Sequence, residues 1–191
     1  MTKSDLLQSI EDLEQHYRSP RKTSQSKISD KLSPLMQKWL AFSSFFILST
    51  VSDEGLDCSP RGDKPGEAFR ILDDRTIAIP DRRGNNRIDT LRNLINDPQI
   101  GLLFIVPGVD EALRIKGTAT ISINADLLQS FIANDLPAPA TVILVNIKSA
   151  YVQNARAIRR SELWNADNHG DVSRLPSAEE LSISISGQTS A

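Results

Sequence analysis

Several residue types that mark common protein classes are scarce in this chain of 191 residues. It has one cysteine, Cys58, which cannot form a disulfide within the chain, so a small secreted scaffold held by disulfides is excluded. Its apolar runs, such as 102–106 and 142–145, are far shorter than the roughly 20 residues that span a bilayer. The first residues lead into a charged stretch and not into the apolar core of a secretory signal. We therefore expect a cytoplasmic protein that does not act in a membrane.

The chain is also poor in the residues and motifs of hydrolytic and metal-dependent catalysis. It has only two histidines, which lie far apart, and no cluster of cysteine and histidine with metal-ligand spacing. It contains no Gly-x-Ser-x-Gly motif and no glycine pattern of the Walker or Rossmann type. The sequence therefore predicts no metal site, and it singles out no catalytic residue.

The charge balance argues against a nucleic-acid partner. The chain has 22 basic and 24 acidic residues, a net charge of -2 and only 5% aromatic residues. The densest basic stretch, with Arg82, Arg83 and Arg87, is interrupted by Asp81 and Asp89. A nucleic-acid binder would usually be basic and would offer aromatic platforms for stacking. We expect none here.

The pattern of apolar residues predicts short strands with a few helices between them. A helix start is indicated at Ser33-Pro34, with Leu35, Trp39 and Phe42 on one face of the helix that follows. Alternation and turn residues predict strands over 45–51, 56–63, 76–79, 99–106, 113–123 and 141–147. Helical spacing predicts further helices over 6–17, 85–96, 126–133 and 151–164.

Strands and helices do not alternate strictly, which favours a mainly β fold, a barrel with flanking helices, over a parallel α/β fold. We expect three regions in the chain. They are an N-terminal helix and linker over 1–27, one domain over 28–164, and a polar tail over 165–191 that forms no packed element.

Two segments could bind a ligand. The segment Pro80–Arg87 joins a predicted strand to a helix start, where backbone N–H groups, asparagine side chains and an arginine would suit a phosphate. The segment Ser59–Asp63 places Arg61 and Gly62 at a strand end, where a glycine lets a flat ligand approach the backbone. The alternatives are an ordinary exposed turn for the first segment and a β-bulge for the second.

The order of several blocks resembles one known family. The blocks are Ser59-Pro60-Arg61-Gly62-Asp63, the segment from Pro80 to Asn93, Gly101-Leu102-Leu103-Phe104, Leu113-Arg114-Ile115-x-Gly117, and Arg160-Ser161-x-Leu163-Trp164. In this order they are similar to the pyridoxamine phosphate oxidase-like FMN-binding split-barrel family, in its branch of mostly uncharacterised bacterial proteins.

The resemblance implies a six-stranded split β-barrel that works as a homodimer with FMN bound at the interface. It implies that the phosphate is held by the turn before the helix and the ring by the two strand ends, with a further contribution from the C-terminal block. The cofactor-binding residues that it indicates are Arg61, Gly62, Asp63, Pro80, Asp81, Asn85, Asn86, Arg87, Arg160 and Trp164.

The resemblance also implies a reaction. Because the flavin carries the hydride chemistry, the protein needs no acid–base pair of its own. We expect an FMN-dependent oxidoreductase that acts on a small substrate or accepts electrons from a nicotinamide. The alternative is a binding module without turnover, which holds flavin, haem or deazaflavin.

Overall fold

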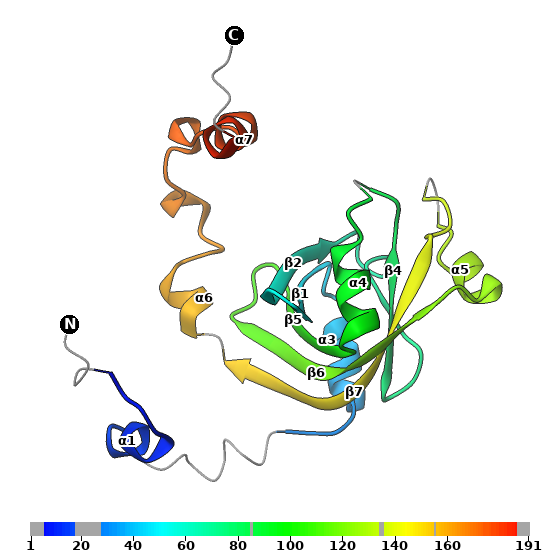
Figure 1. Cartoon of the computed structure of the whole chain (residues 1–191), viewed down its shortest axis with the longest axis horizontal. Helices are drawn as coiled ribbons and strands as arrows, with labels where there is room; N and C mark the ends of the chain where they lie inside the picture. Colours follow the sequence, from blue (N-terminus) through cyan, green and yellow to red (C-terminus); the bar gives the residue numbers. More distant parts are fainter. Residues whose placement is uncertain (1–5, 18–27, 85, 134–135, 155, 187–191) are drawn as a thin grey trace. The chain divides into compact units, whose positions relative to one another are not determined.

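A computed structural model of the whole chain describes residues 6–17, 28–84, 86–133, 136–154 and 156–186. Contacts divide the chain into two units, 1–154 and 155–191, and each is described by itself. The first unit contains the β-sheet (Figure 1). No helix among the described residues is long and apolar enough to cross a membrane.

Seven strands form one antiparallel sheet in the order β2-β1-β5-β6-β7-β4-β3 (Figure 1). The strands are β1 (Phe45–Ser52), β2 (Gly55–Gly62), β3 (Arg70–Ile71), β4 (Thr76–Asp81), β5 (Gln99–Ile105), β6 (Glu111–Ser122) and β7 (Thr141–Asn154). The predicted mainly β fold is confirmed. The two-residue strand β3, which pairs with β4, adds a seventh strand to the six expected.

The strands form because every second side chain can enter a common core. In β1 the buried positions are Phe46, Leu48 and Thr50, whereas the residues between them are half-buried. Phe46, Phe69 and Phe104 pack together with ring centroids 4.8–5.9 Å apart. These aromatic contacts join β1, β5 and the loop before β3 into one core.

A bulge interrupts the longest strand pair, β6 with β7, between Lys116 and Gly117. A Cβ atom at Gly117 would lie 2.2 Å from the carbonyl oxygen of Asn146. The close approach of the two backbones therefore requires glycine at this position.

The described part of the first unit also contains four helices: α1 (Ile10–Gln15), α3 (Pro34–Leu40), α4 (Asp89–Asn96) and α5 (Ala125–Ser130). As predicted, α3 begins after Ser33, whose side chain accepts a hydrogen bond from the Met36 backbone N–H. The predicted apolar face of α3 is wrong in part, because Leu35 and Phe42 are 78% and 65% exposed and Leu40 is the buried residue. Packing against the core therefore decides which side chains of α3 are buried, and the spacing along the helix alone does not predict them.

The helix predicted over 85–96 begins later, at Asp89. This helix, α4, packs against β1 and β6, and its Asn93 Nδ2 donates a hydrogen bond to Thr50 Oγ1 at 3.0 Å. The N-terminal helix is also shorter than the predicted 6–17, since α1 covers Ile10–Gln15 and has no buried residue.

The end of β7 corrects one prediction. Tyr151 to Asn154, expected to begin a helix, continue the strand because they pair with residues 111–114 of β6. A short helix, α6 (Arg156–Arg160), follows in the C-terminal unit. This unit also contains two 3-10 turns and α7 (Ala178–Ser186), and none of the side chains described in α7 is buried.

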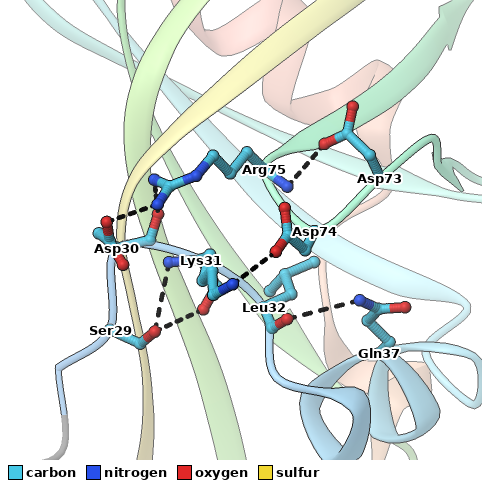
Figure 2. A network of polar contacts seen from close by, with 8 residues as sticks. All are labelled: Ser29, Asp30, Lys31, Leu32, Gln37, Asp73, Asp74 and Arg75. Carbon is cyan, nitrogen blue, oxygen red and sulfur yellow. Dashed lines mark hydrogen bonds and ion pairs between the residues drawn. The ribbon is translucent and has the colours of Figure 1, made fainter.

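A short strap, residues 29–32, is tied to the sheet by polar contacts (Figure 2). Ser29 forms a β-bridge with Ala150. Arg75 Nη2 donates to Asp30 Oδ2 at 2.7 Å, and Lys31 Nζ lies 2.9 Å from Asp74 Oδ2. The hydrogen bond from Arg75 holds the pKa of Asp30 below its ordinary value. These contacts fix the strap, whose Leu32 is buried in the core.

Candidate functional site

The candidate site begins with an ion pair between two strand ends that are not neighbours in the sheet. Arg61 Nη1, at the end of β2, donates to Asp81 Oδ2, at the end of β4, at 2.9 Å. The two side chains are only 26% and 16% exposed. Since β2 is the first strand of the sheet and β4 the sixth, the sheet must curl until these two ends meet. We call this meeting of the ends of β2 and β4 the seam.

The seam also reaches the first turn of α4. Arg61 Nη2 donates to Thr90 Oγ1 at 3.1 Å, and Thr90 is buried. One guanidinium group therefore joins β2, β4 and α4. This contact places the start of α4 beside the seam.

A cavity of about 160 Å³ opens at the seam. Its lining residues are Arg61, Gly62, Asp63, Ala68, Ile79, Pro80 and Arg82. Arg82 Nε lies 3.9 Å from Asp63 Oδ2, and these side chains are 21% and 26% exposed. The cavity thus has an apolar floor and two arginine–aspartate pairs beside it.

Buried polar atoms without a hydrogen-bond partner gather near this cavity. Two of them, Arg61 Nε and Arg82 Nε, belong to lining residues. Ser59 Oγ comes from the strand residue two positions before Arg61, and Thr141 Oγ1 from the residue paired with Asp81. Because buried polar groups are nearly always hydrogen-bonded, these donors and hydroxyls are expected to meet water or a polar ligand.

Gly62 contributes to the site in a way that the sequence did not indicate. A Cβ atom there would lie 3.0 Å from the Ser44 carbonyl oxygen and 3.3 Å from Phe45 Cδ2. The atoms that a side chain would meet therefore belong to the segment paired with β2. The close approach of a flat ligand to Gly62 stays a prediction.

The turn before α4 has an unusual backbone. Asn86 and Ile88 have φ angles of 59° and 51°, in the left-handed region that costs a β-branched residue most. Arg87 is 76% exposed, and its Nε lies 2.8 Å from Asp89 Oδ2. The N-cap residue of α4 is Ile88, which gives the helix no side-chain cap hydrogen bond. Asn85 lies outside the described residues.

The structure thus brings five of the predicted residues to the seam: Arg61, Gly62, Asp63, Pro80 and Asp81. Asn86 and Arg87 are not among the cavity lining, although α4 begins next to the seam. Arg160 and Trp164 belong to the C-terminal unit, so their part in the site stays a prediction.

Three lining residues were not predicted: Ala68, Ile79 and Arg82. Arg82 could have been found, because it lies two positions after Pro80 in an extended segment, and alternate side chains of a strand share one face. Ala68 comes from the loop before β3, which carries no pattern that would indicate a site.

Comparisons with known proteins agree with this geometry. The sequence model of the family described as pyridoxamine 5'-phosphate oxidase matches residues 32–156. No curated protein matches the chain.

Two solved structures have the same fold with a TM-score of 0.50 each. One is a candidate pyridoxamine 5'-phosphate oxidase from Lactobacillus delbrueckii, 20% identical, with 64% of this chain and 95% of that chain covered. The other is HupZ from Group A Streptococcus, 18% identical, with 65% and 96% covered.

The family match covers well over half of the chain and includes every strand. The antiparallel sheet with its flanking helices has the fold of the L. delbrueckii structure. The chain therefore belongs to the pyridoxamine 5'-phosphate oxidase-like family of FMN-binding split-barrel proteins.

Proposed function

We propose that this protein binds FMN at the seam and acts, as a homodimer, as an FMN-dependent oxidoreductase on a small substrate. The observation that carries the proposal is the group of buried polar atoms that lack partners beside the cavity: Ser59 Oγ, Arg61 Nε, Arg82 Nε and Thr141 Oγ1. Family membership supplies the identity of the ligand.

The residues present fit the polar end of FMN. A phosphate group and a ribityl chain offer the acceptors and hydroxyls that the unsatisfied donors need. The start of α4 adds backbone N–H groups that its N-cap residue, Ile88, does not cap, and Arg61 holds this start at the seam. Asn86 and Arg87 precede it, so we assign them, together with Asn85, to the phosphate.

The size of the cavity supports a homodimer. Ligand pockets usually measure about 300–1,000 Å³, whereas the cavity of one chain measures about 160 Å³. One chain therefore encloses one end of FMN, and the flavin ring needs further walls. A second copy of the chain would supply them.

A surface suited to that second copy runs across the sheet next to Gly62. Sheet pairing aligns Pro60, Ile47, Leu103, Arg114 and Tyr151 in one row on the face opposite the core. The three central residues of this row are half-buried in a single chain. Phe45, paired with Gly62, extends this partly apolar face to the edge of the cavity.

In this proposal the flavin carries out the chemistry and the protein binds and positions it. Bound flavin would accept and donate the hydride. The chain's own residues would bind the phosphate, fix the ring at the strand ends and keep water from it. In our proposal Arg160 and Trp164 complete the site, and the electron donor is a small substrate or a nicotinamide.

The test is an absorbance spectrum of the purified protein, followed by anaerobic addition of NADH or NADPH. We expect a yellow protein that releases FMN on denaturation and whose flavin bleaches with a donor. Colourless protein that takes up no added FMN would contradict the cofactor. A haem Soret band, or flavin that stays oxidised with every donor, would favour the alternative of a binding module.

A further inference from the structure

Arg82 lies between the cavity and the segment that joins α5 to β7. Its Nη2 donates to the Phe131 carbonyl oxygen at 3.1 Å, and its Nη1 donates to the Pro137 carbonyl oxygen. The same side chain lines the cavity. Both terminal nitrogens thus contact residues of one connecting segment, and the same residue lines the cavity.

The described residues of this connecting segment, 131–133 and 136–140, have further contacts. Phe131 is 2% exposed and packs with Ala78 and Val142, and the Arg70 guanidinium lies 4.7 Å from its ring centroid. At the other end, the Ala140 backbone N–H donates to the Asp81 carbonyl oxygen at 3.0 Å. Arg82 adds a side-chain contact to the carbonyl of Pro137.

The third nitrogen of Arg82 has a different environment. Its Nε is buried and has no hydrogen-bond partner. The Oδ2 atom of Asp63, at 3.9 Å, is too far away for a hydrogen bond. Since a guanidinium presents its donors in a rigid plane, an acceptor that binds Nε also fixes both Nη nitrogens.

We propose that Arg82 is a ligand-binding and positioning residue, which gives Nε–H to an acceptor oxygen of the bound ligand while its Nη nitrogens hold the α5–β7 segment. The inference rests on the proposed flavin site and extends it. It adds Arg82, which was not among the predicted residues, to the flavin site. It also couples the binding of the ligand to the residues around Phe131 and Pro137. Binding at the cavity then makes the backbone around Phe131 and Pro137 open less often.

Hydrogen–deuterium exchange of the full-length protein tests this, with FMN as the ligand and peptides that cover residues 127–141 as the readout. We expect FMN to slow exchange in these peptides several-fold. Arg82→Lys keeps the charge but has one nitrogen in place of three, so it cannot reach the ligand and both carbonyl oxygens at once. FMN should therefore bind about tenfold more weakly, which corresponds to the loss of one buried hydrogen bond. In this variant FMN at saturation should no longer slow exchange in the segment.

Arg83→Ala is the matched control, because Arg83 is the next arginine and is exposed. It should change neither FMN affinity nor protection. If Arg82→Lys unfolds in a thermal melt, Arg82→Gln, which keeps a planar donor, takes its place with the same expectations.

The outcomes separate the two proposals. A wild-type protein that binds FMN without slower exchange in the segment, or a variant that keeps the full effect, overturns the role of Arg82 and leaves the flavin site intact. Wild-type protein that binds no FMN overturns both.

Discussion

Two arginine-bearing corners flank the connection from β4 to α4, and they are built differently. At the seam, Arg61 and Arg82 are about three-quarters buried, and their terminal nitrogens contact residues far away in the sequence. At the turn before α4, Arg87 is 76% exposed, and the carboxylate it contacts is two residues away. A buried guanidinium with fixed partners is organised before a ligand arrives, whereas an exposed one must be ordered by it. The seam should therefore fix the position of the ligand, whereas the turn should mainly add positive charge near it.

Replacing Arg61 should have the largest effect. Arg61→Ala leaves the carboxylate of Asp81, 16% exposed, without its cation, and the Thr90 hydroxyl without its donor. We expect the free energy of unfolding to fall by about 3 kcal/mol, because an unpaired, largely buried charge is costly. Urea denaturation measures this change.

Thr90→Val is the control for Arg61→Ala. It removes only one hydrogen bond and should cost about 1 kcal/mol. Equal stability of Arg61→Ala and wild type would mean that the ion pair does not hold the seam closed.

Arg87→Ala should weaken FMN binding and leave the stability of the fold nearly unchanged. We expect the affinity for FMN to fall by about 2 kcal/mol, or roughly thirtyfold, because a charge-assisted hydrogen bond to phosphate is lost. The free energy of unfolding should change by less than about 0.5 kcal/mol, since exposed ion pairs contribute little. FMN titration followed by fluorescence measures the first quantity, and unchanged affinity would place the phosphate elsewhere.

A substitution in the turn before α4 should increase stability, whereas the variants above decrease stability or affinity. Ile88→Gly should raise the free energy of unfolding by up to about 1 kcal/mol, because glycine adopts a φ of 51° without the steric cost that isoleucine has. Ile95→Gly on the same helix is the matched control and should lower it by about 0.5–1 kcal/mol. Thermal or urea unfolding of both variants measures these changes. If both variants are less stable than the wild type, the backbone at Ile88 is not strained.

The smallest effect concerns the strap, which serves as a reference for exposed ion pairs. Arg75 holds the pKa of Asp30 below its ordinary value, so this pair stabilises the protein at neutral pH. The contribution is lost as the pH falls below the ordinary aspartate range and through the lowered pKa of the folded protein. Asp30→Asn should therefore melt slightly earlier at pH 7, and the difference in Tm should close in acid. A difference that widens in acid would contradict this assignment.

Much of the fold could be predicted from local patterns. The hairpin of β1 and β2 follows from an apolar run, a turn of Ser52 to Gly55, and a second extended run. Where long-range pairing decides, local patterns failed. Tyr151 to Asn154 are strand because β6 pairs with them, and the helical spacing of Tyr151, Ala155 and Ile158 was misleading here.

The candidate site shows the same division. The segments with Arg61 and Asp81 were singled out from residue types and from the family resemblance, and the structure joins them by an ion pair. Arg82 was not in the predicted set, although its spacing to Pro80 indicates the cavity face; its contacts to carbonyl groups about 50 residues further along the chain have no local signal. Such contacts follow from the pairing of β4 with β7 and not from a motif.

The bulge at Gly117 has a consequence for reading substitutions in this family. Any other residue would place a Cβ atom 2.2 Å from the Asn146 carbonyl oxygen, so selection would reject nearly every mutant codon there. In a saturation library scored for flavin content, this position would rank with those at the seam. Its intolerance would come from two backbones that touch, and a ranking based on tolerance alone would count it as part of the active site.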